Sequence, residues 1–269
     1  MIATLEAFFQ AIINAILLAG IYGILAAGLS LCFGVTRVAD SAHAAFAILG
    51  SHMVYWLFIL YGIDPILSMA ISVPILFVIG FLVQKFTVSR MIGRGGLEAF
   101  TLTFFLATLL ENGQIVAWGN EYRAIVSQYG STSISIGGLY FPLGRLIAFI
   151  ACIIVQLALY AFLRFTYVGK AMRAIAQNRD SAKLCGVPVE LIYMLAFGLS
   201  LALASIGGTM IAICYTFYPS IQTIWIGRLY AVVILGGLGS IPGSLVASFI
   251  LTISDSIIGM FAPVLWGNI

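Results

Sequence analysis

The sequence predicts an all-α, polytopic membrane protein with seven or eight transmembrane segments in a single domain, residues 1–269. Of its residues, 62% are hydrophobic and 8% are charged, whereas soluble domains carry about 25% charged residues. The apolar residues gather in runs of about 20, the length that crosses a ~30 Å hydrocarbon core as a helix. So few charges exclude a soluble enzyme, a nucleic-acid-binding protein and a disordered tail.

Six apolar runs are each long enough for one membrane helix: 9–34, 44–62, 66–83, 99–118, 144–163 and 190–213. A seventh run, 229–262, is long enough for two helices and is interrupted by the glycine-rich stretch 236–243. A polar break, 34–40, also separates the first two runs. Irregular backbone inside a membrane is tolerated where it is buried in protein or lines a cavity. The sequence therefore predicts broken or re-entrant helices at both places.

The charged residues predict the topology. The loops 84–98 and 164–190 together hold eight of the twelve Lys and Arg residues. The positive-inside rule assigns both loops to the cytoplasm, and the two helices predicted between them make this consistent. The polar loop 119–143 is then external, and the N-terminus is expected on the external side as well.

The motifs of common enzymes are missing from the sequence. It contains no phosphate-binding loop, no G-x-S-x-G, no H-E-x-x-H and no dinucleotide fingerprint. His43 and His52 lie nine positions apart, and the four cysteines show no C-x-x-C spacing. We expect no catalytic residue, no metal site and no cofactor bound by this chain. A protein that moves a solute across the membrane, or holds a partner there, fits better than an enzyme.

The loop 164–190 contains a segment that predicts a short amphipathic helix. Gly169 precedes the strong helix formers KAMRAIAQN. Met172, Ile175 and Ala176 lie three or four positions apart and form one small apolar face. Three polar residues of the segment face elsewhere: Lys170, Arg173 and Gln177.

A second short turn is expected after this helix, capped by Asn178 or Asp180 and ended by Gly186. Two interpretations of the segment stay open. It can rest on lipid headgroups, or its apolar face can fit a groove on a soluble partner. The face consists of Ala, Ile and Met without Trp or Phe anchors, which favours contact with protein.

Three stretches resemble one family. GKAMRAIAQNRDSAKLCGV resembles the coupling loop of the LivH/LivM branched-chain amino acid permeases of ABC importers. YGILAAGLSLCFGVTRVADSAHAAFAILGS resembles the first helix, the glycine-bearing break and the second helix of that family. YAVVILGGLGSIPGSLVASFIL resembles its G-G-x-G-S-x-x-G re-entrant segment. The three stretches follow the order and spacing of the family across nearly the whole chain.

The resemblance implies one permease subunit of an ATP-driven importer with ABC-importer permease architecture. Its partners would be a second permease subunit, identical or different, two cytoplasmic ATPase subunits that bind ATP and Mg²⁺, and a periplasmic or extracellular solute-binding protein. The location would be the inner or plasma membrane of a bacterium or archaeon, in contact with lipid. The solutes would be branched-chain or other hydrophobic amino acids, or urea and amides. The residues that would couple to the ATPase are Gly169, Lys170, Met172, Arg173, Ala174, Ile175, Gln177, Asn178, Asp180, Ala182 and Gly186.

The chain departs from the family pattern at two places. Where the family has Asn-Phe-Ala-His-Gly, this sequence has Asp-Ser-Ala-His-Ala at residues 40–44. The sequence also stops at Ile269, before the final helix and the Arg-Pro-rich tail that are usual in the family, so we expect either a truncated chain or a short member.

The solute pathway is expected near the broken helices and near polar residues inside apolar runs. The candidates are Asp40, His43, Glu111, Asn112, Gly236, Gly237 and Gly239. Other roles remain open for several of them. Asp40 can pair with Arg37, His43 can bond to backbone, and Glu111 can lie near the external interface or bond a neighbouring helix.

A second hypothesis is a self-contained channel or an ion-coupled secondary transporter. It would use Glu111 or Asp255 as a proton or cation site, and it would leave the loop 164–190 as ordinary surface.

Overall fold

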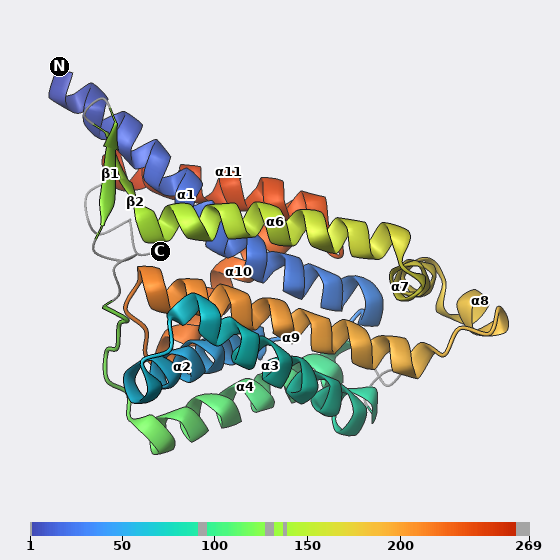
Figure 1. Cartoon of the computed structure of the whole chain (residues 1–269). Helices are drawn as coiled ribbons and strands as arrows, with labels where there is room; N and C mark the ends of the chain where they lie inside the picture. Colours follow the sequence, from blue (N-terminus) through green and yellow to red (C-terminus); the bar gives the residue numbers. More distant parts are fainter. Residues whose placement is uncertain (1, 91–95, 127–131, 137–138, 262–269) are drawn as a thin grey trace.

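The computed structural model describes residues 2–90, 96–126, 132–136 and 139–261 (Figure 1). Parts of two predicted loops, residues 91–95, 127–131 and 137–138, lie outside the described residues. The helices are α1 (Ile2–Thr36), α2 (His43–Tyr61), α3 (Pro65–Phe86), α4 (Gly96–Trp118), α6 (Leu143–Phe165), α7 (Tyr167–Gln177), α8 (Arg179–Leu184), α9 (Val189–Cys214), α10 (Gln222–Gly236) and α11 (Ile241–Phe261). Short 3₁₀ turns span Val88–Arg90 and Pro219–Ile221, and β1 (Ser133–Ile136) pairs antiparallel with β2 (Leu139–Pro142).

Eight of the described helices are long and apolar enough to cross a membrane. The prediction of an all-α polytopic protein is confirmed, and the count of seven or eight segments becomes eight. One boundary was wrong: the seventh run was expected to start at residue 229, whereas α10 begins at Gln222. The reason is that Trp225, Leu229 and Val232 form a buried stripe that continues the helix through polar residues.

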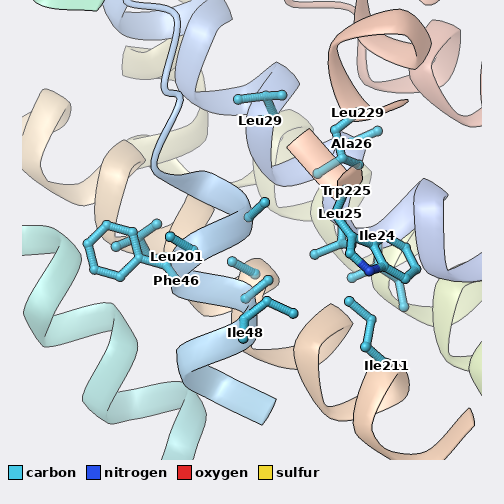
Figure 2. Close-up of a cluster of buried hydrophobic side chains, with 14 of the residues drawn as sticks. Ile24, Leu25, Ala26, Leu29, Phe46, Ile48, Leu201, Ile211, Trp225 and Leu229 are labelled. Atoms are coloured by element: carbon cyan, nitrogen blue, oxygen red, sulfur yellow. The ribbon is translucent and has the colours of Figure 1, made fainter. Parts of the chain in front are cut away.

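The long helices α1 and α9 form the centre of the bundle. α1 packs against α6, α9, α10 and α11, whereas α9 packs against α1, α2 and α3. Figure 2 shows the buried cluster between them, with Leu25 of α1, Phe46 of α2, Leu201 of α9 and Trp225 of α10. The outer helices expose large apolar side chains, as expected for surfaces in contact with lipid: Val78, Phe105, Ile154 and Val246.

Small residues allow the central helices to approach closely. A β-carbon on Gly208 of α9 would overlap the carbonyl oxygen of Ala47 on α2, and a β-carbon on Gly207 would overlap Leu25 of α1. The hydroxyl of Ser51 donates a 2.7 Å hydrogen bond to the Gly208 carbonyl across the same crossing. The glycine pair is therefore a packing seam, as membrane helices commonly use.

The two ends of the bundle differ. The β1–β2 hairpin and the start of α1 lie at one end, whereas α7, α8 and the end of α3 lie at the other (Figure 1). The described residues of the loops 84–98 and 164–190 therefore lie at the same end. That this end is cytoplasmic stays a prediction from the charges.

Candidate functional site

The α7–α8 segment follows α6 after a tight turn at Thr166, which ends α6 and begins α7. The hydroxyl of Thr166 accepts a 3.0 Å hydrogen bond from the Gly169 amide, which caps α7. A β-carbon on Gly169 would overlap the backbone of Phe162 and Leu163, so this close turn requires glycine. The amide oxygen of Asn178 accepts a 2.9 Å hydrogen bond from Ser181, which confirms Asn178 as the cap of α8.

The apolar face of α7 is covered by this chain itself. Met172 and Ile175 of the predicted face, together with Ala171, are buried in a cluster with Leu31 of α1 and Ile192 of α9, whereas Ala176 is half-buried. The interpretation in which this face fits a groove on a partner is therefore wrong, because the face packs within the bundle. Its burial fixes α7 against α1, α6 and α9.

The surface that α7 and α8 leave exposed is mainly polar. Of the predicted coupling residues, Lys170, Arg173, Gln177, Asn178, Asp180 and Gly186 are exposed, Ala174 is half-buried, and Gly169, Met172, Ile175 and Ala182 are buried. The side chain of Leu184 on α8 is 90% exposed. A partner that docks here would contact the polar side of α7 and the tip of α8.

The α7–α8 segment is joined directly to the break between α1 and α2. The guanidinium of Arg37 donates a 3.4 Å hydrogen bond to the carbonyl of Ala176, in the last turn of α7. The expected pairing of Arg37 with Asp40 was wrong, because Arg37 is exposed whereas Asp40 is fully buried. Sequence reasoning missed this link because no local pattern relates residues 139 positions apart.

Asp40 and His43 lie inside the bundle at the start of α2. One Asp40 oxygen accepts a 3.0 Å hydrogen bond from the Ala42 amide, and the other lies 3.8 Å from His43 Nδ1. His43 Nδ1 also lies 3.4 Å from the Ser200 hydroxyl, which donates to the carbonyl of Gly28. Among the described residues, Asp40 Oδ2 and His43 Nε2 have no hydrogen-bond partner.

The three candidate glycines lie at the turn between α10 and α11. Gly237 and Gly239 have positive φ angles of 88° and 86°. A β-carbon on Gly236 would meet Gly243 at 2.5 Å, and one on Gly239 would meet Gly34 of α1 at 2.9 Å. These glycines hold helix ends together. Gly239 also lines a cavity of about 830 Å³ with Gln156, Arg164 and Arg173.

Glu111 and Asn112 lie near the opposite end, on α4. The amide of Gln222 donates a 2.9 Å hydrogen bond to Glu111 Oε2 and so connects α10 with α4. The exposed side chain of Asn112 donates to the carbonyl of Thr108 in its own helix. The seven candidate pathway residues therefore occupy three separate places rather than one site.

Sequence reasoning missed two arginines as candidate site residues. Arg145 lies at the start of α6 and Arg228 in the middle of α10. Both are half-buried and contact aromatic rings or hydroxyls. Arg228 was missed because the helix was expected to begin after it. A charged residue inside an apolar run would have been the signal.

Comparisons with known proteins agree on one family. A family described as "Branched-chain amino acid transport system / permease component" matches residues 11–269. A probable branched-chain amino acid transport permease protein LivH from Methanocaldococcus jannaschii is 31% identical, over 95% of this chain and 82% of the relative. BraD from Pseudomonas aeruginosa, a high-affinity branched-chain amino acid transport system permease protein, is 21% identical, over 93% of this chain and 85% of the relative.

One solved structure is similar over most of the chain. PsaBC from Streptococcus pneumoniae, in complex with Fab, has a TM-score of 0.48 and 16% sequence identity, covering 94% of this chain and 82% of that chain. The conclusion about the family rests on the sequence matches. This multi-pass protein of the inner or plasma membrane belongs to the family of branched-chain amino acid transport system permease components.

Proposed function

We propose that this chain is one permease subunit of an ATP-driven importer for branched-chain or other hydrophobic amino acids, or for related neutral solutes such as urea and amides. It would act with a second permease subunit, two cytoplasmic ATPase subunits that bind ATP and Mg²⁺, and an external solute-binding protein. The names of the relatives support the amino acid as solute.

The observation that carries this proposal is the construction of α7 and α8. An ordinary surface loop has no need of an amphipathic helix whose apolar face is buried against three transmembrane helices. The arrangement suits a lever, because a force on the exposed side of α7 and α8 reaches α1, α6 and α9 through packed side chains. ATP-dependent closure of the ATPase subunits would supply that force and would favour one of two access states.

The link between Arg37 and Ala176 extends the lever. It connects the last turn of α7 with the break before α2, where the backbone is irregular. Movement of α7 would therefore displace the break between α1 and α2. In other transporters, irregular backbone of this kind inside the membrane lines cavities.

The alternative, an ion-coupled carrier or channel, has less support. Glu111 accepts a hydrogen bond from Gln222, and Asp255 is exposed on α11. Within the described ranges, no three His, Cys, Asp or Glu side chains gather as a cation site would require. A single carboxylate that bonds a neighbouring helix is explained by packing.

Purification from native membranes, followed by reconstitution in liposomes, tests the proposal. We expect an ATPase to co-purify with the chain, and we expect leucine uptake that requires ATP and the binding protein. Uptake of leucine by the purified chain alone, without ATP, would establish the carrier instead.

A pair of variants tests the role of α8. Leu184→Asp places a charge on the exposed tip of α8 and should weaken ATPase binding about tenfold, as substitutions of central interface residues do. Val126→Asp is the matched control, because Val126 is 85% exposed in the segment that follows α4 at the other end. Equal ATPase binding by both variants would exclude α8 as the docking element.

A further inference from the structure

A pocket of about 400 Å³ opens at the hairpin end of the bundle, between α1, β2, α6 and the end of α9. One wall is fixed by Gln10 of α1. Its side-chain amide donates to the Tyr140 carbonyl at 2.7 Å and accepts from the Tyr140 amide at 2.8 Å. Asn14, one turn further along α1, and Arg145 of α6 also line the pocket. The pocket therefore combines a rigid frame with one cationic side chain.

Arg145 is held by neutral groups. Its guanidinium donates a 3.3 Å hydrogen bond to the amide oxygen of Asn14 and lies 5.1 Å from the centre of the Tyr215 ring. Among the described residues, no carboxylate lies within 4 Å of it. A guanidinium has five N–H donors in a planar fork that suits a carboxylate or a phosphate. In the part of the chain that the structure describes, the bond to Asn14 occupies one of these five donors.

Aromatic rings lead from Arg145 to the second arginine. The Tyr215 ring lies 6.4 Å from Trp225 of α10, and Trp225 lies 5.0 Å from Tyr22 of α1. The hydroxyl of Tyr22 accepts a 3.1 Å hydrogen bond from Arg228. Burial raises the pKa of Tyr215 to about 12, against the opposing effect of Arg145, so the ring stays neutral. Two cations are thus separated by an apolar, aromatic stretch.

Arg228 carries a charge inside a membrane helix. A charged side chain in the middle of a membrane helix is costly and marks functional sites in membrane proteins. Arg228 is half-buried, bonds Tyr22 and interacts electrostatically with Asp255 of α11. The side chain of Arg228 lies deeper in the bundle than that of Arg145, because Arg145 is in the first turn of α6 and Arg228 is in the middle of α10.

We propose that this pocket binds the carboxylate of the transported solute through Arg145, and that the rings of Tyr215, Trp225 and Tyr22, which are packed together in this structure, part during transport to pass the solute to Arg228. The inference rests on the proposed function, since an amino acid supplies both a carboxylate for the arginines and an apolar side chain for the rings. A lipid phosphate offers the same anionic chemistry, so the experiment has to separate the two sources.

Charge-selective labelling of a thiol in the pocket tests the proposal. Tyr140→Cys places the thiol at the pocket, because Tyr140 lines it and is exposed, and the background carries Cys185→Ser and Cys214→Ser. The importer is reconstituted without the binding protein and labelled with an anionic and a cationic methanethiosulfonate. After each rate is divided by the rate of the same reagent with a free thiol, we expect the anionic reagent to be favoured about threefold because of Arg145. Arg145→Lys should keep this preference and Arg145→Gln should abolish it.

Competition identifies the ligand. Leucine should slow the anionic reagent, whereas leucinamide, which has no carboxylate, should not. A preference that survives Arg145→Gln overturns the proposal. So does a preference that follows the phosphatidylglycerol content of the vesicles and is unaffected by leucine, since the anion is then a lipid headgroup.

Uptake by the wild-type importer separates this inference from the proposed function. Absence of leucine uptake would contradict the proposed function, whereas uptake without protection of Tyr140→Cys by leucine would contradict this inference alone. Arg228→Gln should lower the maximal uptake rate about tenfold and leave the labelling preference unchanged, with partial rescue by Arg228→Lys. Unchanged uptake would exclude Arg228 from the pathway.

Discussion

The two interruptions of the bundle have similar sequence patterns and different structures. The first, residues 37–42 between α1 and α2, is mostly buried and is held by side chains from other helices. The hydroxyl of Thr103 on α4 donates to the Ala39 carbonyl at 3.0 Å and accepts from the Ser41 amide at 3.2 Å. The second, residues 237–240 between α10 and α11, is more exposed and is closed mainly by its own backbone, with Gly237 bonded to Ile234 and Ser240 to Gly237. One longer bond comes from another helix, since the hydroxyl of Ser30 on α1 donates to the Ser240 carbonyl at 3.4 Å.

This difference follows from where the backbone polar groups find partners. A buried N–H or C=O needs a partner from the protein, so the first interruption depends on residues distant in sequence. A turn near the end of a bundle satisfies its groups locally, and glycine supplies the positive φ angles. Substitutions on α4 should therefore destabilise the first interruption, and substitutions of its glycines should destabilise the second.

The largest effect is expected for Gly243→Leu. A β-carbon on Gly243 would overlap the Gly236 carbonyl, and backbone atoms cannot move aside as a flexible side chain can. Because the ends of α10 and α11 would be forced apart, we expect the variant to lose about 3 kcal/mol or more of stability. The measurement is the amount of monodisperse protein in detergent, together with its thermal unfolding midpoint.

Gly227→Ala is the control for this variant. Gly227 lies in α10 itself, and no described atom lies within 4 Å of the position its β-carbon would take. Alanine is favoured over glycine inside a helix by about 1 kcal/mol, so this variant should be as stable as the wild type or more stable. If Gly243→Leu behaves in the same way, the contact between the two helix ends has no part in stability.

Thr103→Val should have an intermediate effect. Thr103 is fully buried, and valine keeps its shape while removing the hydroxyl that bonds both Ala39 and Ser41. The two backbone groups left without a partner should cost about 1–3 kcal/mol. The unfolding midpoint of the purified chain measures the loss.

Thr101→Val is the matched control on the same helix. The hydroxyl of the exposed Thr101 donates to the carbonyl of Leu97, one turn earlier in the sequence, and contacts neither interruption through that bond. Its replacement should change stability by less than about 0.5 kcal/mol. Equal midpoints for the two valine variants would show that Thr103 does not hold the first interruption.

The helices were predictable because their signal is local. A run of about 20 apolar residues is sufficient to identify a membrane helix. The runs predicted seven or eight such helices, the described residues contain eight, and α10 was placed too late. The cap of α8 by Asn178 was also predictable, because a cap joins neighbouring residues.

The partners of the candidate site residues were not predictable, because they depend on which helices meet. Arg37 and His43 both lie three positions from Asp40, so the spacing alone does not decide which of them lies against it, whereas burial of the start of α2 in the bundle does. Likewise, the apolar stripe of α7 could be recognised, but not the fact that α1 and α9 cover it. Periodicity identifies a face that needs a partner, and tertiary packing decides whether that partner is in the same chain.

The smallest effect is expected for Arg37→Gly, which makes the first interruption resemble the second. Arg37 has a φ angle of 56°, the positive region that side chains other than glycine adopt at a cost of about 1–2 kcal/mol. Glycine removes that cost, but it is more flexible in the unfolded chain and loses the bond to Ala176. These opposing contributions should leave stability within about 1 kcal/mol of the wild type.

Arg37→Val separates the contributions, because it loses the same bond and places a β-branched side chain, which tolerates this region less well than arginine, at a positive φ angle. Its unfolding midpoint should therefore lie below that of Arg37→Gly. If the two variants have equal midpoints, the backbone at residue 37 is not strained, and the bond to Ala176 accounts for the whole role of Arg37. In that case the positive φ angle at residue 37 would carry no free-energy cost for a residue other than glycine. The first interruption would then differ from the second only in its bonds to other helices.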